Sequence, residues 1–280
     1  MNVCEWVKSL YVNIIMLNKS KKGRNMIWKI KRYQFLFEEL VKRDFTKKYK
    51  RTALGIGWSM LAPLMNLLIM WLVLSRFFGS NVNHYIVYLF SGQIVFSYFV
   101  DATNLGMNAL VSNASIFTKV NVPKYMFLFS QNVSSLINFG LTLILLFALT
   151  LLDGVHVTYK FLLLIYPIAC LIVFNIGMGL ILSALFVFFR DMQYLWGIIT
   201  QLISWLSAIF YTIDSYSYVA RCMFLLNPLY VYIRYFRKII LDGTIPTIQF
   251  HLLAAFYALL ALGIGSFIYK KYNTEFLYYV

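Results

Sequence analysis

Long apolar runs dominate the chain, and most of its polar positions fall between them. Six of the runs are long enough to cross a bilayer, because a membrane-spanning helix needs about 20 predominantly apolar residues. They cover approximately residues 57–78, 84–105, 125–152, 161–189, 194–213 and 248–269. The pattern therefore predicts an all-α integral membrane protein whose six transmembrane helices occupy residues 57–271.

The first 56 residues follow a different pattern, in which charged and apolar positions recur at helical spacing. From Met26 to Val41, apolar side chains return every three or four residues, with charged side chains mainly on the other side. This periodicity predicts an amphipathic helix within residues 26–56 that lies in the plane of the membrane interface. A solvated basic helix packed on its own protein is the alternative. Residues 1–25 are an N-terminal extension with a second, shorter apolar set.

Residues 214–247, between the fifth and sixth runs, are irregular. Two apolar runs, residues 222–226 and 229–233, are separated by Asn227-Pro228, and neither is long enough to span a bilayer. We expect an external re-entrant pair of half-helices, because irregular backbone at membrane depth must be covered by protein or line a wet cavity. An ordinary external loop is the alternative.

Composition and charge support this membrane topology. The chain is 61% hydrophobic and 12% charged, whereas soluble domains are about 45–50% apolar and about 25% charged. Fourteen of its 25 basic residues precede Gly55, so an internal N-terminus gives 19 basic residues inside against 6 outside. Both termini, including the tail at 272–280, are therefore predicted to be cytoplasmic. Beside a membrane domain, anionic lipids or a cytoplasmic partner are favoured over nucleic acid as the counterpart of the basic segment.

Residues of the kinds that enzymes use are few and widely separated. His84, His156 and His251 lack metal-binding or acyl-transfer spacing, and the three cysteines include no CxxC pair. The sequence contains no G-x-x-x-x-G-K-[ST] motif for nucleotide phosphates. We therefore predict no catalytic residue, no metal site and no cofactor bound by this chain. Asp101 is an acid within a predicted span, but it lies in the hydrated cytoplasmic half, which argues against proton coupling.

Aromatic residues make up 19% of the chain. Some are expected to be interfacial anchors, but others lie deep in the second and fifth apolar runs, namely Phe96, Tyr98, Phe99, Trp205, Phe210 and Tyr211. Flat rings that carry a hydroxyl or indole group suit the apolar face and polar rim of a sugar. Packing between helices is the alternative for these rings.

Four motifs occur in a fixed order between residues 30 and 271. They are Lys42-Arg43-Asp44-Phe45 followed by Tyr49, Arg51, Leu54-Gly55, Trp58 and Pro63; Phe188-Phe189-Arg190-Asp191; Ile209-Phe210-Tyr211 with Ile213-Asp214; and Asn227-Pro228. In this combination the chain resembles the polysaccharide-exporting ABC permeases, the type-2 exporter subunits that move O-antigen or teichoic acid. Ala208 departs from the family pattern, which has a proline at that position.

The resemblance implies an assembly and a substrate. Such permeases form homodimers and bind two copies of a separate ABC ATPase, which carries the ATP and Mg²⁺. Their substrate is an undecaprenyl-linked polysaccharide, which crosses the bacterial inner membrane through a channel between the protomers. ATP-driven extrusion of such a glycan is therefore the expected function, and this chain would supply the path and the gates. Capsule, teichoic acid and lipopolysaccharide O-antigen remain open as cargo.

The resemblance also implies roles for particular residues. Residues 107–124 would hold the ATPase coupling loop, with contacts from Ile116, Phe117, Lys119, Val120 and Pro123. Residues 30–52 would be an interface gate helix that carries Arg43, Asp44, Tyr49 and Arg51. The channel aromatics would be Phe96, Tyr98, Phe99, Trp205 and Tyr211, the external gate would contain Asn227 and Pro228, and the inner turn would be Arg190 and Asp191.

Two other functions remain as alternatives. A type-2 ABC permease for a drug or a lipid would lack the interface helix and the Leu-Gly-x-x-Trp entry at residues 54–58. A membrane-embedded transferase for lipid-linked sugars would need a catalytic acid or histidine facing outward. The outward acids, Asp153, Asp214 and Asp242, are each isolated in the sequence.

Overall fold

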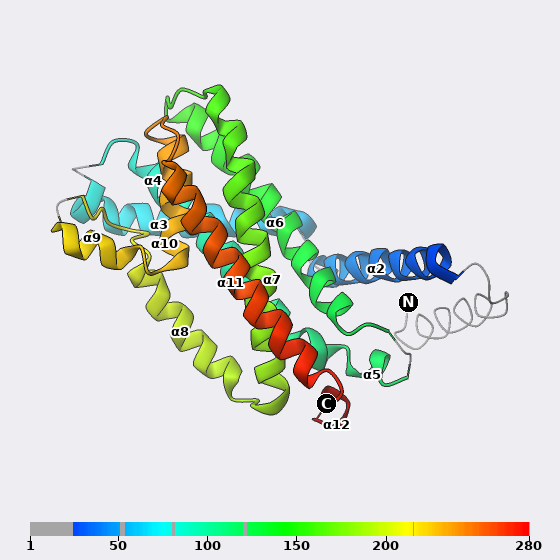
Figure 1. Cartoon of the computed structure of the whole chain (residues 1–280). Coiled ribbons are helices and arrows are strands. Elements are labelled where there is room, and N and C mark those ends of the chain that lie inside the picture. The colour runs from blue at the N-terminus through cyan, green and yellow to red at the C-terminus, as the bar shows by residue number, and fades with distance from the viewer. Residues whose placement is uncertain (1–24, 51–53, 80–81, 120–121, 215, 280) are drawn as a thin grey trace.

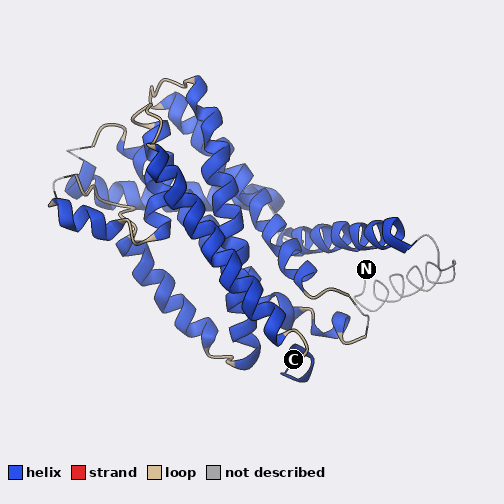
Figure 2. Cartoon of the chain, in the orientation of Figure 1, coloured by secondary structure: helices blue, strands red, loops and turns tan. Residues whose placement is uncertain are grey.

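The computed structural model describes residues 25–50, 54–79, 82–119, 122–214 and 216–279. Over these residues the chain consists of helices and loops (Figure 2). In chain order the elements are α2 (Asn25–Tyr49), η1 (Gly55–Gly57), α3 (Trp58–Phe78), α4 (Tyr85–Ser112), α5 (Ala114–Phe117), α6 (Tyr125–Leu152), η3 (Tyr159–Leu164), α7 (Ile165–Phe188), α8 (Met192–Leu206), α9 (Tyr218–Phe224), α10 (Pro228–Ile240), α11 (Ile248–Tyr272) and α12 (Phe276–Tyr279). The predicted all-α class is confirmed.

Five helical segments in the described part of the chain are long and apolar enough to cross a membrane. They are Gly55–Phe78, Tyr85–Ser112, Tyr125–Leu152, Tyr159–Phe188 and Ile248–Tyr272. Each matches one of the predicted runs, so the chain is a multi-pass membrane protein. The second of these helices continues to Ser112, seven residues beyond its predicted end at residue 105. The first part of the predicted coupling loop is therefore helical.

The fifth predicted span is a shorter helix than its apolar run suggests. The run predicts a helix over residues 194–213, whereas α8 ends at Leu206 and has 15 residues. At 1.5 Å per residue it is about 22 Å long, less than the ~30 Å hydrocarbon core. Ala208 then adopts a positive φ of 49°, which ends the helical path. Contacts from α4 and α10 hold the backbone that follows.

The bundle is built around α4, α6, α7 and α11. Helices α7 and α11 cross at glycines: a Cβ on Gly177 would lie 2.4 Å from the carbonyl carbon of Ala261, so only glycine permits this approach. In Figure 1, α2, α5 and α12 lie at one end of the bundle, and α9 and α10 lie at the other. Helix α8 runs between the two ends (Figure 1).

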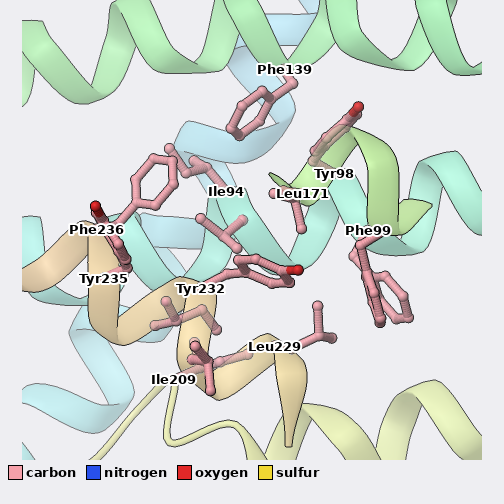
Figure 3. Close-up of a cluster of buried hydrophobic side chains, with 14 of the residues drawn as sticks. Ile94, Tyr98, Phe99, Phe139, Leu171, Ile209, Leu229, Tyr232, Tyr235 and Phe236 are labelled. Carbon is pink, nitrogen blue, oxygen red and sulfur yellow. The ribbon is translucent and has the colours of Figure 1, made fainter. Parts of the chain in front are cut away.

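Two short helices, α9 and α10, occupy the irregular segment, with Asn227-Pro228 between them. The Asn227 Oδ1 accepts a hydrogen bond from the backbone N–H of Leu229 at 3.0 Å, and Pro228 fills the first helical position. Ten of the 13 residues of α10 are buried. Figure 3 shows three of them, Tyr232, Tyr235 and Phe236, packed in the core. Helix α10 is therefore largely internal, whereas α9 has no buried residue.

Candidate functional site

A cavity of about 400 Å³ lies between α3, α4 and α6. Its lining combines amides, hydroxyls and one carboxylate with aromatic rings. The residues are Trp58, Ser59, Ala62, Pro63 and Asn66 from α3; Gln93, Ile94, Ser97, Tyr98 and Asp101 from α4; and Ser135, Asn138, Phe139 and Thr142 from α6. We call this the polar cavity. Its volume lies within the ~300–1,000 Å³ typical of small-ligand sites.

The side chains of the polar cavity are held by contacts between its walls. The Nε2 of Gln93 donates to the carbonyl oxygen of Pro63 at 3.3 Å, and the hydroxyl of Ser59 donates to Oδ1 of Asn138 at 3.3 Å. The ring of Tyr98 stacks on that of Phe139, with 4.5 Å between centroids. Gln93 is 6% exposed, yet its Oε1 accepts no hydrogen bond from any described residue. The cavity wall therefore contains a buried acceptor for which no described residue supplies a donor.

Helical spacing brings these side chains to one place. Gln93, Ser97 and Asp101 follow each other at four-residue steps, so they line one face of α4. On α3, Ser59 and Asn66 likewise lie on one face, as do Ser135, Asn138 and Thr142 on α6. Gln93, Ser135 and Asn138 are buried, whereas Asn66, Ser97 and Asp101 are exposed. The three helices thus bring a row of polar groups to the cavity, which makes it a candidate binding surface.

A second polar group joins α2 to the C-terminal end of α4 and the N-terminal part of α6. Arg43 forms an ion pair with Asp44, with 2.6 Å between Nη2 and Oδ1, and also donates to Oδ1 of Asn113 at 2.7 Å. The other oxygen of Asp44 accepts from the hydroxyl of Ser130 at 3.0 Å. Asn113 is fixed in turn by its donation to the carbonyl oxygen of Ala109 at 2.8 Å. We call this the Arg43 network.

A buried arginine holds the irregular backbone that follows α8. The guanidinium of Arg237, on α10, donates to the carbonyl oxygens of Ala208 at 2.8 Å, Ile209 at 2.8 Å and Tyr88 at 3.2 Å. It also lies 3.5 Å from the centroid of the Tyr88 ring. Gly92 leaves room for it, because a Cβ there would lie 2.7 Å from Nη2. We call this the Arg237 clamp.

Comparison with known families agrees with a membrane transporter. The model of the family described as ABC-2 type transporter matches residues 36–241. The chain belongs to this family. The O-antigen export system permease protein RfbA of Myxococcus xanthus is 25% identical over 257 residues, or 90% of this chain and 97% of that protein. The protein of that name from Klebsiella pneumoniae is 23% identical over 246 residues, or 86% of this chain and 95% of that protein.

A capsule-type relative extends the similarity. The polysialic acid transport protein KpsM of Escherichia coli is 25% identical over 241 residues, which cover 83% of this chain and 92% of that protein. The predicted family is thereby confirmed, and this ABC-2 chain aligns with these relatives over most of their length. Its predicted site residues can now be placed in the structure.

The predicted channel aromatics of this ABC-2 chain do not form one group. Tyr98 lines the polar cavity, and Phe96 is partly exposed beside Phe99. The prediction is corrected at Phe99, which is 1% exposed and packs between the rings of Phe174 and Trp196, at 5.9 and 5.8 Å. It fills the core and offers no ring face to a ligand.

Two other predicted aromatics lie beyond the polar cavity, at the end of α8. Trp205 is 57% exposed, and its carbonyl oxygen accepts a hydrogen bond from the hydroxyl of Tyr211 at 2.7 Å. The Tyr211 ring lies 6.3 Å from that of Phe78 and 6.4 Å from that of Phe224. The predicted channel aromatics therefore lie in different places: Tyr98 lines the polar cavity, whereas Trp205 and Tyr211 lie at the end of α8. Nearby, Nδ2 of Asn227 donates to the hydroxyl of Ser207 at 2.9 Å.

The predicted coupling residues surround α5. Phe117 is 5% exposed and packs against Phe127 at 6.1 Å, so it anchors the loop and presents little surface to a partner. Ile116 and Pro123 are partly buried, and Lys119 is exposed. Val120 lies outside the described residues, as does Arg51 of the predicted gate helix. Tyr49 ends α2, but its side chain is not among those described.

The buried Lys124 links the coupling region to the end of the chain. Its Nζ lies 5.8 Å from the centroid of the Phe117 ring and 5.5 Å from that of Phe276, and it donates to the carbonyl oxygen of Asn273. Burial lowers the pKa of this ammonium group below its ordinary value. The C-terminal segment is therefore docked on the coupling region.

The predicted inner turn, Arg190 and Asp191, follows the end of α7 at Phe188. Among the described residues, Arg190 and Asp191 form no ion pair within 4 Å of each other. Arg190 lies instead 5.4 Å from the centroid of the Phe186 ring, and both residues are exposed. This cation–π contact joins Arg190 to a ring four residues earlier in the chain, and the carboxylate of Asp191 stays exposed.

Proposed function

We propose that this ABC-2 chain is the membrane-spanning subunit of an ATP-driven exporter that moves a lipid-linked polysaccharide across the bacterial inner membrane. Relatives that align over most of both chains are named as O-antigen export system permease proteins and as a polysialic acid transport protein. O-antigen and capsule-type polymers are the favoured cargo. The chain provides the path, and a separate ATPase provides the free energy.

The lining of the polar cavity favours a glycan over an apolar cargo. Its amides and hydroxyls can exchange hydrogen bonds with sugar hydroxyls, and the exposed ring of Trp58 offers an apolar face. A drug or lipid tail in the same place would leave these polar groups without partners, which is costly in a low-dielectric site. The unpaired Oε1 of Gln93 suits a donor hydroxyl of a sugar.

The proposed assembly is a homodimer with six membrane crossings in each protomer. Helix α8 serves as the fifth crossing, since it joins the two ends of the bundle (Figure 1). Helices α9 and α10 are the external re-entrant pair, and both termini are cytoplasmic. Two ATPase subunits bind beneath the bundle and hold ATP and Mg²⁺, because the sequence has no phosphate-binding loop of its own.

Coupling is proposed to start at α5 and the exposed Lys119, which contact the ATPase. A displacement of this loop pulls on Asn113, and the Arg43 network passes the pull to α2. Because α2 precedes α3 in the chain, its movement displaces one wall of the polar cavity. Nucleotide-driven closure of the ATPase subunits thereby alters the path for the polymer.

The test combines purification with a matched pair of variants. The tagged chain, isolated from its native membranes in mild detergent, should bring down an ABC ATPase in near one-to-one ratio. In a deletion strain, Gln93→Leu should leave lipid-linked polymer on the cytoplasmic side, whereas Gln201→Leu, on exposed α8 outside the cavity, should restore export. Recovery of the chain without an ATPase, or full export by Gln93→Leu, would overturn the proposal.

A further inference from the structure

A second cavity, of about 550 Å³, opens between α2, α6 and α7. Its lining is mainly apolar and includes Phe37 from α2, Phe129, Val133 and Leu136 from α6, and Ile172 from α7. We call it the interface groove. Tyr33 and Gln34 of α2 border it as well, so the groove lies between the amphipathic helix and the membrane-spanning bundle.

One buried amide lies in the lining of this apolar groove. Asn132, on α6, is 3% exposed, and neither its Nδ2 nor its Oδ1 forms a hydrogen bond with a described residue. An unpaired buried amide is unfavourable, so the site lacks a polar partner for it. The terminal torsion of asparagine is soft, and a small rotation brings the amide toward a molecule in the groove.

The depth of Asn132 fits the ester region of a membrane lipid. Tyr125 begins α6 at the inner end and is 48% exposed, and Asn132 follows seven residues later, about 10 Å along the helix axis. An amphipathic interface helix buries its apolar face ~5–10 Å into the boundary between headgroups and acyl chains. Leu136 is one turn deeper still. Along its length the groove thus has a polar end, then the Asn132 amide, then an apolar end. This order matches the headgroup, the ester and the acyl chain of a glycerolipid.

The charge on α2 indicates the headgroup. In the sequence of α2, the basic residues Lys29, Lys31 and Arg32 precede Tyr33, which lines the groove. Basic residues at the inner leaflet attract anionic lipids. A polyprenyl phosphate would match this charge but carries no ester carbonyl to accept a hydrogen bond from the Asn132 amide.

We propose that the interface groove is a binding site for an anionic glycerophospholipid of the cytoplasmic leaflet. Its acyl chain lies along Val133 and Leu136, an ester carbonyl accepts from Nδ2 of Asn132, and the phosphate lies beside the basic start of α2. The lipid joins α2 to the bundle and so supports the helix that carries the Arg43 network. This site is separate from the polar cavity and does not depend on the cargo that passes through the protein.

The experiment uses the full chain in its native complex, reconstituted in nanodiscs of equimolar phosphatidylglycerol and phosphatidylethanolamine. Lipids that stay bound after transfer to detergent are counted by native mass spectrometry. Val133→Trp fills the groove, and Asn132→Leu removes the amide while it keeps the same number of side-chain heavy atoms. Ile144→Trp is the matched control, since it lies on the same helix, is 58% exposed and does not line the groove.

The wild type and Ile144→Trp should retain phosphatidylglycerol in preference to phosphatidylethanolamine. Val133→Trp should lose it, and Asn132→Leu should bind it about tenfold more weakly, as expected for the loss of one buried hydrogen bond. Asn132→Leu should remain folded, because it removes an unpaired polar group, and gel filtration checks this. Equal retention by all four proteins, no headgroup preference, or displacement of the bound lipid by polyprenyl phosphate but not by phosphatidylglycerol would overturn the proposal.

Discussion

The Arg237 clamp predicts a large and local loss of stability when its guanidinium is removed. In Arg237→Met, the carbonyl oxygens of Ala208 and Ile209 lose charged donors at 2.8 Å. The carbonyl of Tyr88 keeps another donor, the hydroxyl of Ser91 at 2.9 Å. A buried polar group left unpaired costs ~1–3 kcal/mol. The carbonyl of Ile209 is then unpaired, and that of Ala208 keeps only a long bond from the Tyr88 hydroxyl at 3.5 Å. The expected loss is therefore below that of two fully unpaired carbonyls, about 2–4 kcal/mol, after which α10 should separate more readily from the end of α8.

A matched control is available on the same helix. Arg234 pairs with Asp214 at 3.4 Å, where the two side chains are 31% and 64% exposed. Exposed ion pairs contribute ~0–1 kcal/mol, so Arg234→Met should have little effect. Gly92→Ala should act like Arg237→Met by pushing the guanidinium away. In the double variant Gly92→Ala/Arg237→Met, the alanine should reduce stability less than it does alone. The reason is that Nη2 of Arg237, with which its Cβ would clash, is no longer present.

Cys170 provides the assay. This free cysteine is buried on α7, in the same core cluster as Tyr232 of α10, so it reacts with a thiol reagent when the outer end opens. When opening and closing are fast, the labelling rate follows the population of the open form. A loss of 2–4 kcal/mol should then raise the rate about 30- to 1,000-fold. Cys222 is exposed, and both it and Cys4 are replaced by serine in every variant. A rate within threefold of the parent would refute the reasoning.

Other outcomes concern the coupling loop, the outer rings and the helix crossing. Lys119→Glu should abolish stimulation of ATP hydrolysis while cross-linking still detects the dimer, and intact stimulation would mean that the loop is misassigned. Asn113→Ala removes the acceptor of Arg43 and should lower stimulated ATPase activity, with the partly exposed Asn108→Ala as its unaffected control. Trp205→Ala should slow export without a change in melting temperature, since the ring is 57% exposed, and unaltered export would exclude the ring from the path. Gly177→Ala should destabilise the chain by ~1–3 kcal/mol or more in thermal unfolding, because its Cβ would overlap the backbone of α11.

The spans could be predicted from the sequence because each must be a continuous apolar run long enough to cross the bilayer. Such a run is visible without any knowledge of distant contacts. The exception is α8, whose apolar run continues to Ile213 although the helix ends at Leu206. The contacts that hold the segment after this helix come from distant residues: Arg237 is 28 positions from Ile209, and Tyr88 is 123 positions from Tyr211, whose carbonyl it binds at 2.6 Å. Local periodicity contains no signal for such contacts. The length of the apolar run was therefore a poor guide to the length of this helix.

The polar cavity was not predicted, although its residues were visible in the sequence. Asn66, Gln93 and Asn138 are amides inside apolar runs, and their spacing from other polar residues is helical. Whether these side chains face one cavity depends on the rotation of each helix about its axis. Packing against neighbouring helices sets that rotation. The same reason explains Phe99, which is three residues from Phe96 but points into the core.

The unequal burial of the three cavity walls indicates which wall moves. In α4, 72% of the most apolar window is buried within the chain, whereas the corresponding value for the first span, which contains α3, is 6%. Leu67 is the one buried residue in the described length of α3. Few internal contacts make an element easy to displace, so the polar cavity should widen by movement of α3 against a fixed α4 and α6. Since α2 precedes α3 and is tied to the coupling region through Arg43 and Asn113, a pull at the inner end reaches the movable wall before it reaches the core.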